Sequence, residues 1–470
     1  MSPAQSVKNY KIGKSKCHFL FSALIFGMGS SIGWHVIIDN LDLIKQYVYQ
    51  VNTELYLPLT LIIIIFVITY FQMNRSDIMK FNIQIRNIII IMNITYILSP
   101  LSLIEFSDNF KIIILLLFVF INSVAYSIFN FSFITFTQFL GRNSLILFFI
   151  GNIISGLICN ISKLILFHVL KQNNNNPVEN DSSIFNDNII YHLKIYCISI
   201  FAFVVTIYLF TLYVFKISIN FITNNKMIYF SDYPFRIFIE NNCSGNFNIE
   251  KQLIDTEIKS EVSSLDKKIL TESMLTEIPD NTIQNERKAF FAIFSKLPGV
   301  FIIMTINSLI CYMIFPGILL KIISFYYKDL KGINDNADTL NENYFINFYL
   351  FIYNSFDLLG RILALIKGFT SQKCLCLSSV FRIYFWIIFL LTFITEKLEY
   401  PFFLYRNLKF FIVNLAGFGF SNGLSIISCY NLIRKKIERI LLGKAIGIMY
   451  FSFHFGAFLG ILLLIFFQIQ

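Results

Sequence analysis

The stretch LYLPLTLIIIIFVITYFQM, residues 55–73, contains no charged side chain. A helix needs about 20 apolar residues to cross the hydrocarbon core of a bilayer, so this stretch is long enough to be a membrane span. The rest of the chain is similar, because 56% of its 470 residues are hydrophobic, only 14% are charged, and the mean hydropathy is +0.66. A soluble domain has about a quarter of its residues charged. The composition therefore predicts a membrane protein that crosses the bilayer many times.

Apolar segments recur from one end of the chain to the other. The first opens near Phe19 and lacks a small-residue cleavage site, so it is interpreted as a membrane span and not as a signal peptide. We expect an all-α polytopic membrane protein with eleven transmembrane helices. The predicted spans are residues 19–38, 55–73, 86–105, 112–134, 145–169, 195–215, 299–322, 344–366, 376–395, 410–432 and 445–467.

One long polar connection, residues 217–296, divides the predicted spans into six and five. It is rich in Asn, Ser, Thr, Lys and Glu, and has too little apolar surface to fold well alone, so we expect it to be largely disordered. The predicted organisation is a cytosolic N-terminus (1–18), a six-helix bundle (19–216), the cytosolic loop (217–296) and a five-helix bundle (297–470).

The charges of the short loops predict the orientation. With the N-terminus inside, the inner connections hold fifteen Lys and Arg residues and the outer ones nine. Positive charge is typical of cytoplasmic loops, so the N-terminus is predicted to be cytosolic and the C-terminus outside. The net charge of +10 is then explained by topology and contact with the inner leaflet, and we expect no nucleic-acid partner. The plasma membrane is the default location, and an internal membrane is the alternative.

The eighth predicted span carries a charged pair, Asp357 and Arg361, with Asn354 one turn earlier. Residues four apart share a helix face, and charges inside the membrane usually face the bundle interior or a water-filled cavity. The pair is therefore a candidate substrate site. The alternative is a self-neutralising pair that only fixes helix packing.

Trp34 and His35 lie near the outer end of the first predicted span. The Trp is either an anchor at the membrane interface or a stacking surface for a flat ring, and the residues alone favour the anchor. The eight cysteines show no metal-site or disulfide spacing, and no phosphate-binding Gly-x-x-x-x-Gly-Lys loop is present. We expect no cofactor, no metal and no enzymatic activity.

Several motifs occur in a fixed order along the predicted spans. They are Gly33-Trp34-His35 in span one, Phe315-Pro316 in span seven, YNSFDLLGR (353–361) in span eight, FGFSNG (418–423) in span ten and AIGIMYFSFHFGAFLG (445–460) in span eleven. Together they resemble the equilibrative nucleoside transporter family, with a protozoan-like composition. The resemblance implies a fold similar to the major facilitator transporters with one helix fewer, in which six and five spans face each other across a central cavity.

The resemblance also implies roles for individual residues. Asp357 would accept hydrogen bonds from sugar hydroxyls, Arg361 would donate to the sugar or base, and Trp34 would line the cavity, which reverses the choice of anchor. In span four the family has a Gln that contacts the base, and in the stretch FINSVAYSIFN (120–130) Asn122 is predicted to replace it. His35 replaces an Asn of the family beside the Trp, so pH-sensitive transport is conceivable.

The expected function is facilitative transport of nucleosides by alternating access, with purine nucleosides and also nucleobases as substrates. The protein is expected to act as a monomer in the lipid bilayer. The alternative is a solute carrier of the same fold class for sugars or another small polar solute. A receptor or a lipid-modifying enzyme is a third hypothesis, but eleven spans fit no seven-helix receptor and no intramembrane His/Asp cluster indicates catalysis.

Overall fold

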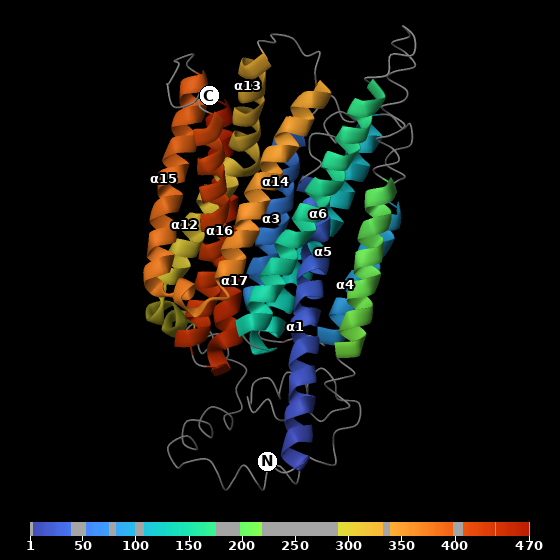
Figure 1. The fold of residues 1–470 in the computed structure, drawn as a ribbon, viewed down its shortest axis with the longest axis vertical. Coiled ribbons are helices and arrows are strands. Elements are labelled where there is room, and N and C mark those ends of the chain that lie inside the picture. The colour runs from blue at the N-terminus through green and yellow to red at the C-terminus, as the bar shows by residue number, and fades with distance from the viewer. Residues whose placement is uncertain are drawn as a thin grey trace.

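The computed structural model is a bundle of long helices (Figure 1). It describes residues 3–38, 53–74, 81–98, 108–140, 142–174, 198–218, 290–331, 339–397, 408–437 and 439–469. All regular secondary structure in these ranges is helical, so the predicted all-α class is confirmed for them. Most of the predicted loop 217–296 lies outside the described residues.

In the first part of the chain the helices are α1 (Pro3–Ile38), α3 (Thr53–Asn74), α4 (Phe81–Leu98), α5 (Asp108–Leu140), α6 (Arg142–Asn174) and a helix over Ile198–Ser218. In the second part they are Phe290–Lys296, α12 (Pro298–Met313), the π-helical turn η2 (Ile314–Ile318), α13 (Leu319–Lys331), α14 (Thr339–Leu363), the short 3₁₀ helix η4 (Lys367–Thr370), α15 (Gln372–Lys397), α16 (Leu408–Lys436) and α17 (Arg439–Ile469). Several helices, such as α15 and α16, run almost the full height of the bundle, whereas α12 and α13 each span only part of it (Figure 1).

Ten of the eleven predicted spans each overlap one helix over their described residues, whereas span 299–322 covers α12, the broken turn η2 and the start of α13. Seven of these helices are long and apolar enough to cross a membrane, and the pair Phe290–Lys296 and Pro298–Met313, bent by 85°, makes an eighth if it is one span. The described helices also expose many large apolar side chains, for example Ile97 and Val413 at 61% and 68%. Such surfaces are unusual on a soluble monomer, and they fit contact with lipid.

The helix that carries the charged pair is not among the seven. In α14, Asn347, Asn354, Asp357 and Arg361 follow one another at spacings of 7, 3 and 4 residues, and all four are buried. This is the spacing of a single helix face, so α14 turns its polar face into the protein. Leu359, between the two charges, is 43% exposed on the other side.

Two helix contacts bring α14 into the centre. It packs against α16 in the second part of the chain and against α6 in the first. A side chain at Gly423 of α16 would collide with the backbone carbonyl oxygen of Asp357 and lie 2.7 Å from its Oδ1, so only glycine allows this approach. The close contact places the carboxylate directly against α16.

The α12 helix breaks where the Phe-Pro motif lies. Phe315 has φ −107° and ψ 130°, which is an extended conformation inside η2. A residue before proline is pushed toward such a conformation because the proline ring collides with a helical predecessor. The break positions Phe315 at the wall of the central cavity described below.

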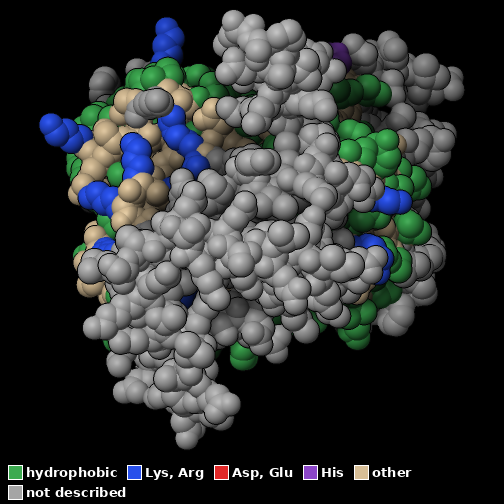
Figure 2. All heavy atoms as spheres, turned by 90° about the horizontal axis from the view of Figure 1, so that it is seen from below, with side chains coloured by type: hydrophobic (Ala, Val, Ile, Leu, Met, Phe, Trp, Pro, Cys, Tyr) green, Lys and Arg blue, Asp and Glu red, His purple; other side chains and the backbone are tan. Residues whose placement is uncertain are grey.

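One end of the bundle carries basic side chains among the described residues. Figure 2 shows the end at which α1 begins, and the described side chains visible there include Lys and Arg but no Asp or Glu. Lys373, Lys435 and Lys436 are exposed, and Lys436 Nζ donates to Gln372 Oε1 at 3.3 Å. We call this the basic end. The last turn of α17 lies at the opposite end (Figure 1).

Candidate functional site

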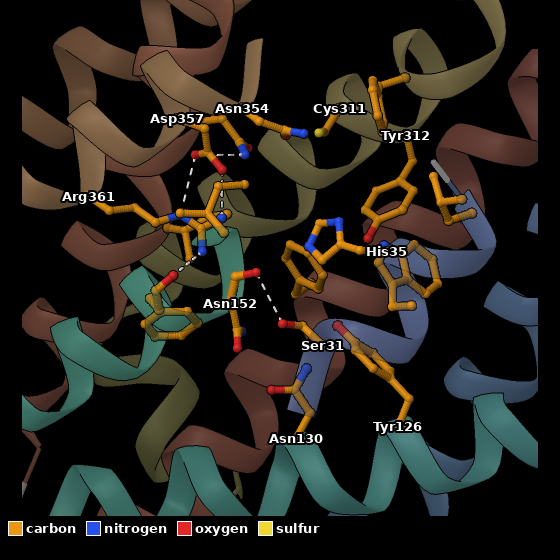
Figure 3. A pocket seen from close by; sticks show the side chains of 18 of the residues that line it. Ser31, His35, Tyr126, Asn130, Asn152, Cys311, Tyr312, Asn354, Asp357 and Arg361 are labelled. Atoms are coloured by element: carbon orange, nitrogen blue, oxygen red, sulfur yellow. Dashed lines mark hydrogen bonds and ion pairs between the residues drawn. The ribbon is translucent and has the colours of Figure 1, made fainter. Parts of the chain in front are cut away.

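A central cavity lies between helices from both parts of the chain (Figure 3). The volume in which the centres of water molecules can lie is about 140 Å³. This is roughly ten times the volume that one buried water needs. Its wall comes from α1, α3, α5, α6, α12, α14, α16 and α17 and from Phe315 of η2. The polar and aromatic lining includes Ser31, Trp34, His35, Tyr126, Asn130, Asn152, Cys311, Tyr312, Tyr353, Asn354, Asp357, Arg361, Asn422, Tyr430 and Tyr450.

The charged pair of α14 lies in this wall. Arg361 Nη2 donates to Asp357 Oδ2 at 2.8 Å and Nε to Oδ1 at 3.4 Å, and the two residues are 7% and 1% exposed. Asn422 of α16 adds a hydrogen bond from Nδ2 to Asp357 Oδ1 at 3.3 Å. A buried ion pair is tolerated only with good geometry and further hydrogen bonds, and this one has both. The predicted pairing of the two side chains on one helix face is present.

Two hydrogen bonds connect α14 to α6 across the cavity. Arg361 Nη1 donates to the carbonyl oxygen of Phe149 at 2.5 Å, and Asn354 Nδ2 donates to Asn160 Oδ1 at 2.6 Å. The same guanidinium therefore contacts the carboxylate on its own helix and the backbone of α6. We call Asp357, Arg361, Asn354 and Asn422 the charged wall.

Aromatic side chains form the other wall. The ring of Trp34 lies 5.4 Å from Tyr126 of α5 and 6.2 Å from Tyr312 of α12, measured between centroids. His35 enters the cavity beside them (Figure 3). A methyl group at Gly156 of α6 would lie 2.6 Å from His35 Cε1, so this glycine makes room for the imidazole. We call Trp34, His35, Tyr126 and Tyr312 the aromatic wall.

Five of the six predicted site residues line the cavity: Trp34, His35, Asn354, Asp357 and Arg361. The structure places the sixth, Asn122, elsewhere. Its Nδ2 donates to the backbone carbonyl oxygen of Gly33 at 3.1 Å, between α5 and α1, and the residue is 1% exposed. A contact between Asn122 and a bound base has no support in this geometry.

Asn130 of α5 is the cavity residue that sequence reasoning missed. It is 2% exposed, and its Oδ1 has no hydrogen bond of normal geometry among the described residues. Figure 3 shows its amide directed into the cavity, near Ser31. Eight helical residues turn the chain by about 800°, so Asn130 points about 80° away from Asn122. The signal was present in the sequence, because the stretch FINSVAYSIFN ends on Asn130.

The sequence model of the nucleoside transporter family matches residues 115–469 of the chain, which is well over half of it. The chain belongs to the nucleoside transporter family. The resemblance seen in the motifs is confirmed at this level, and the chain is a multi-pass membrane protein of a transporter family.

Two further comparisons add little to this assignment. Among solved structures, the crystal structure of a point mutant of the nucleoside transporter NupG is similar over 95% of this chain and 90% of that one. Its sequence identity is 13% and its TM-score is 0.47. A search among curated proteins finds no match.

Proposed function

We propose that the protein is a facilitative nucleoside carrier with a preference for purine nucleosides, and that nucleobases are additional substrates. The observation that supports this most is the charged wall facing the aromatic wall across one cavity in a member of the nucleoside transporter family. A nucleoside has polar hydroxyls at one end and a flat ring at the other. The cavity offers partners for both.

Charge explains why the substrate is a nucleoside and not a nucleotide. The described cavity lining holds one carboxylate, Asp357, and one guanidinium, Arg361, at 2.8 Å from each other. The pair is neutral overall, which suits an uncharged solute. A phosphate would need several converging cations with free donors. In this arrangement Arg361 already uses donors on Asp357 and on the Phe149 carbonyl oxygen.

The substrate orientation follows from the chemistry of the two walls. We assign the ribose to Asp357 and Arg361, because a carboxylate accepts hydrogen bonds from vicinal hydroxyls and a guanidinium donates to their oxygens. Asn354 and Asn422 support this end. The base lies against Trp34, whose indole provides a large flat surface, with His35 beside it. The Asn130 amide, which both donates and accepts, reads the edge of the base.

We further propose that transport follows alternating access between a six-helix and a five-helix bundle in an eleven-span, major-facilitator-like arrangement. The α6–α14 contact lies between the two bundles. At the basic end, Arg142 Nη2 at the start of α6 donates at 2.7 Å to the carbonyl oxygen of Ala364, just past the end of α14. A cation at the carbonyl end of a helix is also favoured by the helix dipole. We call this hydrogen bond between Arg142 and Ala364 the latch. It must break before substrate can leave toward the basic end.

The proposed membrane orientation follows from the basic end of the bundle. The basic end is proposed to face the cytosol, which places the N-terminus inside and the C-terminus outside, in the plasma membrane. The protein is proposed to act as a monomer in the bilayer, since the cavity is complete within one chain.

Uptake of radiolabelled inosine and adenosine into a transport-deficient host tests the proposal. Expression is expected to give saturable uptake that unlabelled purine nucleosides and nucleobases compete for and that hexoses do not. Hexose uptake without purine uptake would instead favour a sugar carrier of the same fold. Leu359→Ala is the matched control for variants of Asp357 and Arg361, because Leu359 lies between them on the exposed side of α14.

A further inference from the structure

A cysteine lies in the wall of the central cavity. Cys311 of α12 is half-buried, and its Sγ lies 3.5 Å from the hydroxyl of Tyr353 on α14. Figure 3 shows it near Asn354 on one side and Tyr312 on the other. The thiol is thus placed between the two walls, where a substrate has to pass or bind.

The cavity around this thiol is lined by two buried polar groups with incomplete hydrogen bonding: the Asn130 amide lies near the Tyr126 hydroxyl, and the Tyr450 hydroxyl lies near Ser127. The Asn130 Oδ1 and the Tyr450 hydroxyl both line it, both are buried, and neither has a hydrogen bond of normal geometry among the described residues. A buried polar atom without a partner costs about 1–3 kcal/mol. Asn130 comes from α5 and Tyr450 from α17, so a ligand between the two parts of the chain would satisfy both.

The other described cysteines differ in position. Cys159 and Cys429 are buried. Cys374 and Cys376 lie in the first turns of α15, at the basic end, where Lys436 contacts Gln372. Among the described cysteines, only Cys311 lines the cavity.

The cavity lining extends to Ile134 of α5 and Tyr430 of α16 on the basic side and to residues near helix ends on the opposite side. Its lining includes Ile38, the last residue of α1, and Pro58, in the first two turns of α3. At the basic end the latch from Arg142 to Ala364 holds α6 and α14 together. A small solute therefore approaches Cys311 from the proposed outer side.

We propose that Cys311 is a modification site for small thiol-specific electrophiles that enter from the outer side, and that its modification blocks the transport pathway. The consequence for transport rests on the proposed function, whereas the modification itself does not. The preferred reagent class is a small cation, because the rings of Trp34, Tyr126 and Tyr312 attract cations in the cavity.

The step uses a methanethiosulfonate as its co-reactant. The Cys311 thiol loses its proton to water, and the thiolate attacks the sulfenyl sulfur of the reagent. A bond forms between Sγ and that sulfur, the bond to the sulfonyl group breaks, and methanesulfinate leaves with the electron pair. The product is a mixed disulfide that holds the reagent's ammonium group in the cavity, and a reducing thiol reverses it.

The test uses intact cells that express the full chain, treated with 2-(trimethylammonium)ethyl methanethiosulfonate, which does not cross membranes. Mass spectrometry of the Cys311 peptide measures modification, and inosine uptake is compared with that of untreated cells of the same variant. We expect a modified peptide and at least about a tenfold loss of uptake in the wild type, and no loss in Cys311→Ser. The Cys374→Ser and Cys376→Ser variants should stay as sensitive as the wild type.

An unmodified Cys311 peptide, or equal loss of uptake in Cys311→Ser, would overturn the inference. Excess inosine provides the separate test of the proposed function, because a bound nucleoside should slow modification of Cys311. If the peptide is modified and inosine gives no protection, the substrate assignment fails while the modification site stands.

Discussion

The charged wall and Asn130, which lies across the cavity from it, differ in how completely their hydrogen-bonding groups are satisfied. On the charged wall, Asp357 accepts hydrogen bonds from Arg361 and Asn422, and the guanidinium also contacts the Phe149 carbonyl oxygen. Across the cavity, the buried Oδ1 of Asn130 has no such partner among the described residues. The charged wall is therefore held in place before a substrate arrives, whereas the Asn130 Oδ1 can gain a further hydrogen bond on binding. Such preorganisation lowers the free-energy cost of binding.

This comparison predicts the largest effect for the charged wall. Asp357→Ala or Arg361→Ala leaves one buried charge without its partner, which costs about 3–5 kcal/mol. We expect inosine uptake to fall at least about 100-fold, measured per molecule of protein at the cell surface. The double variant Asp357→Ala/Arg361→Ala should recover thermal stability relative to either single variant, but not uptake. Normal uptake in both single variants would show that the pair serves only packing.

The latch at the basic end should have the next largest effect. Arg142→Ala removes a charge-assisted hydrogen bond to the Ala364 carbonyl oxygen, worth about 1.5–3 kcal/mol. We expect the population open at the basic end to rise roughly tenfold or more. The measurement is modification of Cys311 by the same thiol reagent in inside-out vesicles, with exposed Lys435→Ala as the control. Unchanged modification would show that the latch does not gate the pathway.

The aromatic wall should affect binding more than stability. Trp34→Ala removes the stacking surface, and an aromatic pair contributes about 0.5–1.5 kcal/mol beyond its buried area. We expect the KM for inosine to rise about fivefold to tenfold, with Trp34→Phe retaining most of the affinity. Because Trp34 is only half-buried, thermal unfolding of the variant should change less than its KM. An unchanged KM for inosine would show that the Trp34 ring does not contact the substrate.

The smallest expected effect is a difference between alanine variants of the two asparagines of α5, Asn122 and Asn130. Asn130→Ala should change the ratio of inosine to adenosine uptake about threefold to tenfold, because a single hydrogen bond contributes about 0.5–1.5 kcal/mol. Asn122→Ala should lower thermal stability, since it leaves the Gly33 carbonyl oxygen without its donor, but should keep that ratio. The reverse pattern would restore Asn122 as the residue that contacts the base.

Sequence reasoning predicted the parts of this structure that have a periodic or chemical signature. The apolar run at 55–73 predicts a helix, and the spacing of Asn354, Asp357 and Arg361 predicts the direction of a polar helix face. These features are local, because they depend on residues less than about three turns apart. The break at Phe315 was not predicted, since residues 299–322 were expected to form one continuous span.

The contacts between segments that are distant in the chain could not be predicted from the sequence. Nothing local indicates that Arg361 contacts the carbonyl oxygen of Phe149, or that Gly156 lies against His35. The position of Asn122 between α5 and α1 depends on the same kind of contact. One turn of α5 faces α1 and another faces the cavity. The packing of α1 therefore decides that Asn122 contacts α1 and that Asn130 lines the cavity.

The central claim is that the Asp357–Arg361 pair binds the ribose of an uncharged nucleoside. The most direct measurement is equilibrium binding of inosine and of 2′,3′-dideoxyinosine to the purified wild type and to Asp357→Asn, with thermal unfolding as the check on folding. We expect the wild type to prefer inosine by roughly tenfold or more, the value of one hydrogen bond to a charged group, and the variant to lose most of this preference. An equal preference in both proteins would contradict the account.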